Sequence, residues 1–376
     1  MIYKGYLRSY PRFGGKNMSY KDNIRRVTPY TPGEQPKETN IIKLNTNECP
    51  YYPSLRVRDK IKELDLNHFR LYPDPAASDL VKAWADYNGL DEDQVFVGVG
   101  SDDVLSMCFL TYFNSDKPVL FPDITYSFYD VWCDVYRIPY KRVPLNDNFE
   151  IEVSDYVDAS KGGVMEVMPG GIVIANPNAP TGTELSLDKI EKIIKANQDC
   201  VVIIDEAYVD FGGTSAIPLI DKYPNVVVVQ TFSKSRAMAG LRIGYAMGSK
   251  ELIKALNDVK YSVNSYTMNY PSIVLGVAAI EDSEYFKAVC DKIIATRENA
   301  KASLSELGFS FADSKTNFIF AKHKSVSGDY IFNELRNRGI YVRHWNKERI
   351  EDYLRITIGT DEQMEDLYSA LKEIVM

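Results

Sequence analysis

Cysteine and histidine, the residues from which disulfide frameworks and many metal sites are built, are scarce in this sequence. Its 376 residues include five cysteines and three histidines. The cysteines are widely spaced, odd in number and never form a Cys-x-x-Cys pair, so they signal neither a disulfide framework nor a zinc site. No histidine lies at helical ligand spacing from another, and we expect no metal centre built on histidine. This cysteine usage is typical of a reducing cytoplasm.

Long hydrophobic runs and an excess of positive charge are also missing. No apolar stretch approaches the roughly 20 residues that are needed to span a bilayer, and the N-terminal stretch lacks the apolar core of a secretion signal. The formal net charge of −8 gives no global positive field that would attract nucleic acid or anionic lipid. We therefore expect a cytoplasmic protein with neither a membrane nor a nucleic acid as its partner.

What is present is the pattern of an ordinary globular protein with alternating strands and helices. A hydrophobic fraction of 45% and a charged fraction of 26% support a large core. From Asp79 to about residue 250, helical periodicity alternates with short apolar runs, which predict strands at 94–100, 118–121, 139–143, 170–177, 200–208 and 225–232. This rhythm predicts an α/β fold with a mostly parallel central sheet and helices on both faces.

After residue 250 the rhythm changes to helices, including a long polar helix that we expect over 283–307. The remainder alternates as strand, helix, strand, strand and helix, which is typical of a smaller α+β domain. Before the sheet, the proline-rich stretch at 28–39 predicts an extended arm rather than packed structure. Met18 would serve as a second start, so we expect residues 1–17 to be an upstream extension without a role in the fold.

Polar residues follow four of the predicted strands directly. These stretches are Ser101-Asp102-Asp103, residues 175–182, Asp205-Glu206-Ala207-Tyr208 and Thr231-Phe232-Ser233-Lys234. The carboxyl ends of parallel strands meet at one edge of a sheet, and this edge is where open α/β folds bind ligands. We therefore expect the four stretches to converge on one site.

Lys234 follows a run of four valines, Val226–Val229, which predicts a strand buried on both faces. A lone lysine is most often a surface cation. A lysine whose pKa is lowered by burial or charge is a nucleophile, and its commonest use is a Schiff base with pyridoxal phosphate. That cofactor also needs a carboxylate for its ring nitrogen and a cradle for its phosphate. Asp205, which follows an apolar strand, offers the carboxylate, although a helix or turn cap is its alternative reading.

A phosphate cradle is available from three neighbouring stretches. Ser101 stands at a predicted helix start, where free N–H groups and the positive end of the dipole favour an anion, although it could equally be an N-cap. Thr231 and Ser233 add hydroxyls. Arg242, flanked by glycines, adds a guanidinium that fits phosphate oxygens.

The motifs NPNAPTG, DEAY, SK and GLRIGY, in that order and with Lys234 29 residues after Asp205, resemble the fold-type-I aminotransferases of class I/II. The resemblance extends from about Lys43 to the C-terminus. It implies that Lys234 binds pyridoxal 5′-phosphate covalently and moves a proton between substrate and cofactor. It also implies that Asp205 binds the ring nitrogen, Tyr208 the ring hydroxyl, and Tyr126 stacks on the ring. The implied phosphate ligands are Ser101, Asp102 through its backbone, Thr231, Ser233 and Arg242.

One position departs from the family pattern. The family has asparagine directly before Pro-Thr-Gly, where it contacts the ring hydroxyl, whereas this chain has Ala179. Asn178 or Asn176 is expected to take over this contact, and we name Asn178 as the cofactor ligand. Turn chemistry in an Asn-Pro loop is the alternative for both asparagines.

The stretches DNIRRVTPYTPGEQP, KLNTNECPYYPS, RLYPDP, YVRHWN and LRITIGT resemble the histidinol-phosphate aminotransferases within that family. This resemblance implies ping-pong transamination between glutamate/2-oxoglutarate and histidinol phosphate/imidazole acetol phosphate, a step of histidine biosynthesis. It implies a homodimer in which Tyr72 reaches the neighbouring subunit's cofactor phosphate. Arg355 and Arg343 are expected to bind the substrate phosphate, and Asn47 and Tyr52 to approach its amino or imidazole end.

Several alternatives stay open. Arg343 could instead be an exposed strand residue that pairs with a carboxylate such as Glu351. A threonine-phosphate decarboxylase and an aromatic amino acid aminotransferase would use the same cofactor motifs. A non-catalytic relative is disfavoured because Lys234 is present with all its partners. The resemblance implies an extension and arm (1–40), a segment joining the small domain and the dimer interface (41–75), a large cofactor-binding domain (76–280) and a small domain (281–376).

Overall fold

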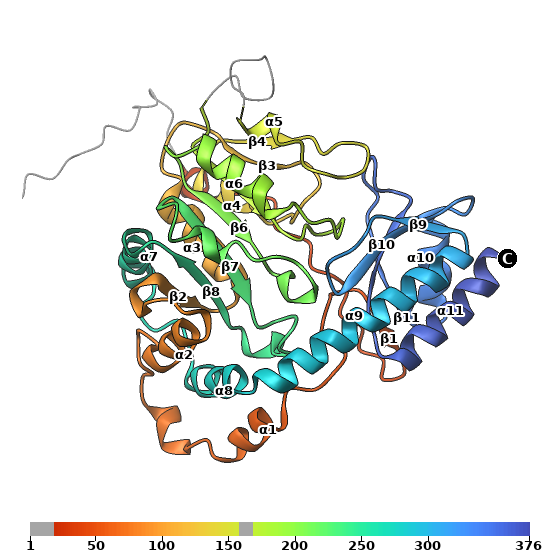
Figure 1. Cartoon of the computed structure of the whole chain (residues 1–376), viewed down its shortest axis with the longest axis horizontal. Coiled ribbons are helices and arrows are strands. Elements are labelled where there is room, and N and C mark those ends of the chain that lie inside the picture. Colours follow the sequence, from red (N-terminus) through yellow and green to blue (C-terminus); the bar gives the residue numbers. More distant parts are fainter. Residues whose placement is uncertain (1–18, 158–167) are drawn as a thin grey trace, which may run out of the picture.

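The computed structural model describes residues 19–157 and 168–376, so the predicted extension over 1–17 lies outside the described residues. A large unit is built on a seven-stranded sheet and a smaller unit on an antiparallel sheet (Figure 1). Helix α9 (Ser283–Glu306) runs from the large unit to the small one, which confirms the long helix predicted over 283–307. No helix within the described ranges is long and apolar enough to cross a membrane.

The central sheet has the strand order β2-β8-β7-β6-β5-β3-β4. Its strands are β2 (Val95–Gly98), β3 (Val119–Pro122), β4 (Tyr140–Val143), β5 (Gly171–Ala175), β6 (Val202–Asp205), β7 (Val226–Thr231) and β8 (Gly244–Gly248). In this sheet of the described chain, β8 runs antiparallel to both of its neighbours, β2 and β7, whereas the other neighbouring pairs are parallel, so the mostly parallel sheet is confirmed. The sequence analysis missed β8, because a five-residue segment that begins and ends with glycine carries little strand signal.

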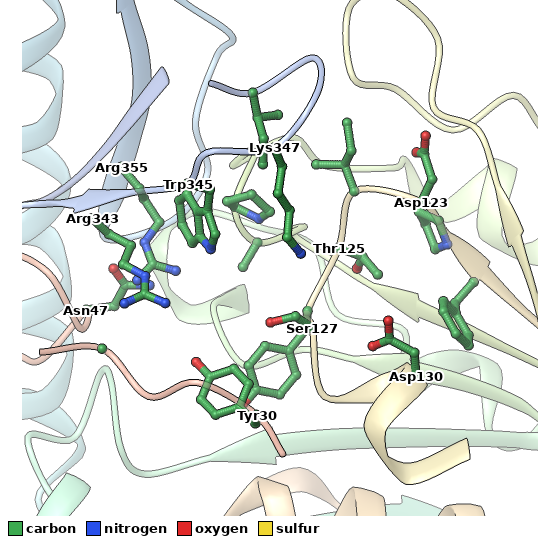
Figure 2. A pocket seen from close by; sticks show the side chains of 18 of the residues that line it. Tyr30, Asn47, Asp123, Thr125, Ser127, Asp130, Arg343, Trp345, Lys347 and Arg355 are labelled. Carbon is green, nitrogen blue, oxygen red and sulfur yellow. The ribbon is translucent and has the colours of Figure 1, made fainter. Parts of the chain in front are cut away.

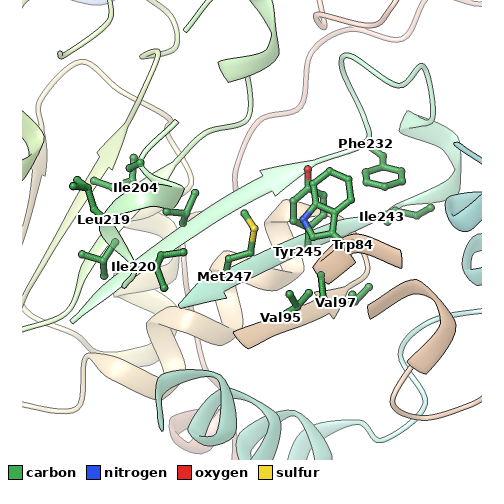
Figure 3. Close-up of a cluster of buried hydrophobic side chains, with 14 of the residues drawn as sticks. Trp84, Val95, Val97, Ile204, Leu219, Ile220, Phe232, Ile243, Tyr245 and Met247 are labelled. Carbon is green, nitrogen blue, oxygen red and sulfur yellow. The ribbon is translucent and has the colours of Figure 1, made fainter. Parts of the chain in front are cut away.

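Helices cover both faces of this sheet. One face packs on α2 (Ser78–Asn88), α6 (Leu187–Ala196) and α8 (Tyr270–Glu281) around the core that Figure 3 shows near Trp84 and Tyr245. The other face packs on α3 (Ser101–Tyr112), α4 (Tyr129–Tyr136) and α7 (Lys250–Val263). Val226 to Val229 are all 0% exposed, which is why an unbroken apolar run specifies this strand.

The small unit contains an antiparallel sheet with the order β12-β13-β10-β9. Its elements are β9 (Phe309–Phe311), β10 (Phe318–His323), α10 (Gly328–Asn337), β12 (Arg343–His344), β13 (Tyr353–Thr357) and α11 (Asp361–Val375). Near it, β1 (Ile42–Lys43) pairs in parallel with β11 (Ile340–Tyr341). The short strands β1 and β9 were not predicted. The segment after β1 includes α1 (Leu55–Lys62), and α5 (Ser154–Val157) precedes β5.

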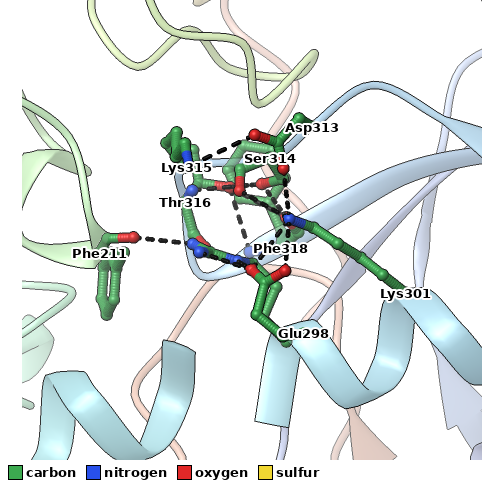
Figure 4. Close-up of polar contacts among 9 residues, drawn as sticks. Phe211, Glu298, Lys301, Asp313, Ser314, Lys315, Thr316 and Phe318 are labelled. Carbon is green, nitrogen blue, oxygen red and sulfur yellow. Dashed lines mark hydrogen bonds and ion pairs between the residues drawn. The ribbon is translucent and has the colours of Figure 1, made fainter. Parts of the chain in front are cut away.

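Polar contacts fasten α9 to both units. The buried guanidinium of Arg297 donates from Nη1 to the carbonyl oxygens of Phe211 and Thr316, each at 2.8 Å. Lys301 pairs with Asp313 at 2.6 Å (Figure 4). Because Phe211 belongs to the large unit and Thr316 to the small one, one side chain of α9 connects the two.

The arm over 28–39 has no regular element and none of its residues is buried, which agrees with the predicted extended arm, but some of its residues contact both units. The ring of Tyr30 stacks on Phe128, with centroids 4.1 Å apart. Arg343 donates to the carbonyl oxygens of Thr31 and Pro32. The arm therefore crosses from the large unit to the small one.

Candidate active site

Two adjoining cavities lie at the carboxyl edge of the central sheet. The inner cavity has a volume of about 170 Å³ and the outer cavity about 450 Å³. Both are lined by Thr46, Tyr126, Tyr208 and Lys234. The inner cavity is lined by nine residues that the sequence singled out: Ser101, Asp102, Tyr126, Asp205, Tyr208, Thr231, Ser233, Lys234 and Arg242. The predicted convergence of four strand ends on one site is confirmed.

Lys234 stands three residues after β7 and projects to the junction of the two cavities. Its Nζ donates to the carbonyl oxygen of Thr46 at 3.1 Å. Burial, and then the positive charge of Arg355, lower the pKa of this amine to about 8. A substantial fraction of the amine is therefore neutral near physiological pH, which a nucleophile or general base requires.

Asp205 ends β6 and is 5% exposed. Its carboxylate accepts hydrogen bonds from the Tyr129 hydroxyl at 2.7 Å and from the Ala207 N–H at 3.2 Å. Burial raises the pKa of this carboxyl to about 6. Within the described chain it forms no ion pair, although it faces the inner cavity. A bound group with a protonated nitrogen would therefore supply the cation that this buried acid lacks.

The far end of the inner cavity can hold an anion. Helix α3 begins at Ser101, and its N-cap is Gly100, with no side-chain cap, so the N-cap reading of Ser101 is wrong and the first N–H groups stay available. A Cβ on Gly100 would come within 2.5 Å of Arg242 Nη2, so glycine lets the guanidinium approach this helix start. Arg242 also reaches the Ser233 hydroxyl at 3.5 Å. The Thr231 hydroxyl in turn donates to Ser233 at 3.0 Å.

Asp102 was expected to contact the phosphate through its backbone, but its side chain also forms contacts in the inner cavity. Its carboxylate accepts from the Tyr126 hydroxyl at 2.7 Å and pairs with Arg242 Nη2 at 3.3 Å. Tyr126 is nearly buried, and its ring lies between the two cavities. The carboxylate thus positions both the ring that is expected to stack on a ligand and the guanidinium that is expected to bind its anion.

The asparagine that contacts Tyr208 is Asn47, which lines the outer cavity. Its Nδ2 donates to the Tyr208 hydroxyl at 2.8 Å, and its Oδ1 accepts from the Thr357 hydroxyl at 3.0 Å. The expected cofactor ligand Asn178 instead uses its amide on Thr125, Thr181 and the carbonyl of Ile124.

Asn176 is likewise bonded to the backbone of Leu185. Both Asn176 and Asn178 line a separate cavity of about 40 Å³. This geometry corrects the expectation for Asn178 and favours the turn chemistry that was its alternative.

Two arginines meet at one end of the outer cavity, where Figure 2 shows Arg343 and Arg355 beside Trp345 and Asn47. Arg355 donates from Nη2 to the Asn45 carbonyl at 2.9 Å, while its buried Nε has no partner in the described chain. Burial lowers the pKa of Arg355, and the charge of Arg343 contributes in the same direction.

Neither guanidinium forms an ion pair within residues 19–157 and 168–376. Arg343 donates hydrogen bonds to backbone carbonyls of the arm, and no ion pair joins it to Glu351 in the described residues, so the alternative Arg343–Glu351 pair is not formed. Two acids that line the opposite end of the cavity are already paired: Asp123 with Arg349 at 3.0 Å, and Asp130 with Arg142. Two unpaired cations that share one cavity wall are suited to an anionic ligand.

Tyr52 and Tyr72 lie away from both cavities. Their exposed fractions are 81% and 82%. Tyr72 stacks on Tyr266, with centroids 4.6 Å apart, while Tyr52 borders a small cavity of about 10 Å³ near Arg236. The expected substrate contact of Tyr52 is therefore not formed within this chain.

Sequence reasoning missed Tyr30, Thr46, Tyr129 and Trp345. Tyr30 and Trp345 line the outer cavity, Thr46 lines both cavities, and Tyr129 reaches Asp205 from the first turn of α4. An aromatic residue in an arm or a helix carries no local signal of a site. Only the proximity of Trp345 to Arg343 in YVRHWN offered a hint.

Residues 39–371 match the family model of aminotransferases of class I and II. A histidinol-phosphate aminotransferase of Lactococcus lactis subsp. cremoris (strain SK11) is 51% identical over 95% of this chain and 98% of its own length. The crystal structure of histidinol-phosphate aminotransferase from Sinorhizobium meliloti, in complex with pyridoxal-5′-phosphate, is similar in fold, with a TM-score of 0.83, 22% identity and coverage of 98% of this chain and 99% of that one. The crystal structure of L-threonine-O-3-phosphate decarboxylase from Porphyromonas gingivalis is also similar, with a TM-score of 0.72 and 22% identity. The match covers 89% of this chain and 99% of that one.

Proposed function

Because the chain belongs to the aminotransferases of class I and II, we propose that it transfers an amino group between glutamate/2-oxoglutarate and histidinol phosphate/imidazole acetol phosphate. The observation that carries this proposal is the pair Arg343 and Arg355, which share a wall of the cavity that also contains Lys234 and form no ion pair in the described chain. A phosphate dianion satisfies two guanidiniums at once. The amine to be transferred then lies toward Lys234.

The inner cavity fits pyridoxal phosphate as cofactor. Asp205 would hold the ring nitrogen, Tyr208 the ring hydroxyl, and Tyr126 a ring face. The phosphate would lie on the start of α3 with Ser101, Thr231, Ser233 and Arg242 around it. When it is bound, the cofactor supplies the electron sink that stabilises the charge left when the substrate Cα loses its proton.

With the cofactor bound, Lys234 would be its covalent anchor and then the base that removes the proton at the substrate Cα. Its lowered pKa keeps a neutral amine available, and the Thr46 carbonyl accepts its N–H and fixes the direction of Nζ. Asp205 would keep the ring nitrogen of a bound cofactor protonated, and Tyr129 favours the ionised form of that acid by donating to it. The arm lines the outer cavity beside the arginines through Tyr30 and Gly33, and its carbonyl oxygens accept hydrogen bonds from Arg343.

The amino donor and acceptor take turns in one site. Arg355 and Arg343 would bind the phosphate of one substrate and the distal carboxylate of glutamate or 2-oxoglutarate in the other half-reaction. A threonine-phosphate decarboxylase would use the same groups, so the fold alone does not separate the two activities. The 51% identity to a histidinol-phosphate aminotransferase supports transamination over decarboxylation.

A homodimer is part of this proposal. Large apolar side chains are exposed on one stretch of the chain and on the loop after α7, among them Tyr52, Leu66, Phe69, Tyr72 and Tyr266. Exposed groups of this kind indicate a protein interface. Tyr72 would then leave its own chain and complete the phosphate site of the neighbouring subunit.

The test is a two-substrate assay on the purified holoenzyme. Histidinol phosphate and 2-oxoglutarate should yield glutamate, and the cofactor's absorption should change on adding histidinol phosphate alone. Phenylalanine should react far more slowly, and threonine phosphate should release no carbon dioxide. Arg355→Met should raise KM for histidinol phosphate about 100-fold, because charged hydrogen bonds to the phosphate are lost. Carbon dioxide release without glutamate formation would overturn the proposal.

A further inference from the structure

The indole of Trp345 contacts both arginines of the outer cavity. The guanidinium carbon of Arg343 lies 5.4 Å from the indole ring centroid and that of Arg355 lies 5.3 Å from it. Figure 2 shows the three side chains grouped at one end of the cavity. Both distances are within the range of cation–π attraction, and tryptophan is the strongest partner for it.

Two guanidiniums this close to one ring repel each other unless something offsets their charge. No carboxylate pairs with either of them in the described ranges, and burial disfavours the charged form of Arg355 further. The negative faces of the indole, together with Phe318, whose ring centroid lies 5.3 Å from the Arg355 guanidinium, supply the attraction instead. The aromatic contacts hold the two cations without neutralising them.

Trp345 is itself held in place by other aromatic side chains. Its ring meets Phe320 edge to face, with centroids 6.4 Å apart, and Phe320 stacks on Tyr353 at 4.6 Å. The same cluster includes Leu145 and Phe149 of the large unit. The indole is therefore fixed by side chains from both units, and it is more than a loop residue that happens to lie over the arginines.

We propose that Trp345 is a positioning residue that fixes the separation of Arg343 and Arg355 and thereby favours a phosphate-bearing substrate over a carboxylate-bearing one. This inference rests on the proposed function. A phosphate dianion has three free oxygens and gains most when both guanidiniums are already in place. A carboxylate has two oxygens, which a single guanidinium can satisfy. Loosening the pair should therefore weaken phosphate binding more than carboxylate binding.

The experiment compares wild type, Trp345→Phe and Trp345→Leu as holoenzymes, in which the cofactor's own phosphate already fills the inner cavity. Calorimetric titration with inorganic phosphate should show binding to wild type, binding weakened about threefold in Trp345→Phe, and about tenfold in Trp345→Leu. KM for histidinol phosphate should rise by the same factors, while KM for glutamate and both kcat values should change less than about twofold. Lys82→Ala removes an exposed cation that lies outside both cavities and serves as the control. Its phosphate affinity and both of its KM values should equal those of wild type.

Tryptophan fluorescence gives a readout that does not depend on turnover. The chain has three tryptophans, and Trp84 and Trp132 are core residues that are 3% and 6% exposed. Phosphate should therefore change the emission of wild type and leave that of Trp345→Phe unchanged. If Trp345→Leu binds phosphate as wild type does, or if both KM values rise equally, the inference is overturned while the proposed function stands. If wild type neither binds phosphate nor transaminates histidinol phosphate, the proposed function itself falls, and this inference with it.

Discussion

The hydroxyl of Tyr129 donates a hydrogen bond of 2.7 Å to the carboxylate of Asp205, and both side chains are buried. Burial raises the pKa of Asp205 to about 6, and the bond from Tyr129 opposes that rise. Tyr129→Phe should therefore raise the pKa further and leave more of the acid protonated near neutrality. Cofactor affinity should fall about tenfold at pH 6.5 and less at pH 8.5, as measured by titrating apoprotein with pyridoxal phosphate.

Tyr126→Phe is the matched control for that substitution. It also removes a tyrosine hydroxyl that donates to a carboxylate, but the partner is Asp102 and not Asp205. Its effect on cofactor affinity should be the same at pH 6.5 and pH 8.5. If cofactor affinity depends on pH in the same way in Tyr129→Phe and in wild type, Tyr129 does not lower the pKa of Asp205.

The same acid should make the cofactor-free protein less stable. Because the folded pKa of Asp205 lies above its unfolded value, its contribution to stability is fully present below about pH 4 and is lost as pH rises through about 6. At pH 8 the ionised group costs on the order of 2–3 kcal/mol. Asp205→Asn should thus raise the apoprotein's Tm by several degrees at pH 8 but not at pH 4.5, and abolish the further rise that cofactor gives wild type. A lower Tm at pH 8 would contradict this.

Much of this site could be predicted because it depends on strand ends. Residues such as Lys234 and Asp205 directly follow apolar runs, and parallel strands necessarily bring such positions to one edge. Seven residues of the inner cavity were predicted in this way: Ser101, Asp102, Asp205, Tyr208, Thr231, Ser233 and Lys234. Tyr126 was named only through the family resemblance, and Thr46 and Glu48 were missed. The fold class followed from the same alternation of short apolar runs and helical periodicity.

The rest of the site depends on contacts between distant segments. Asn47 and Tyr208 are 161 residues apart, and nothing in either local pattern indicates that one amide serves the other's hydroxyl. The packing of Tyr30 on Phe128 likewise appears only once the arm lies across the sheet. Strand β8 was missed for a different reason, because its glycines remove the side chains on which pattern recognition depends.

Substitutions of Asn178 and Asn47 should affect different properties of the protein, stability in the first case and cofactor affinity in the second. Asn178→Ala removes three hydrogen bonds within the loops and should lower the free energy of unfolding by about 2 kcal/mol, with cofactor affinity changed less than about threefold. Asn47→Ala removes the donor to Tyr208 and should reduce cofactor affinity about tenfold. Denaturant unfolding and cofactor titration measure the two quantities. The reverse pattern would restore Asn178 as the cofactor ligand.

Arg355 should control the reactivity of Lys234. After burial, its positive charge is the largest influence that lowers the pKa of this amine to about 8. Arg355→Met should raise that pKa, so that less neutral amine is present at pH 7.5. The rate at which apoprotein incorporates pyridoxal phosphate should fall about threefold at pH 7.5 and approach the wild-type rate near pH 10. Arg343→Met, which removes the neighbouring guanidinium, should leave this profile unchanged. Identical shifts in both variants would contradict a specific effect of Arg355.

Tyr72 is 82% exposed, and its predicted partner is the cofactor phosphate of a neighbouring subunit. Tyr72→Phe and Lys234→Ala homodimers should both be impaired, the first about tenfold through a lost hydrogen bond to the phosphate and the second beyond detection. Unfolding and refolding the two variants together gives hybrids in which one site has both an intact Lys234 and the other chain's intact Tyr72. Because half of a random mixture is hybrid and each hybrid has one such site, activity should recover to about a quarter of wild type. If Tyr72 acts only within its own chain, mixing gives no recovery, and light scattering decides whether a dimer forms at all.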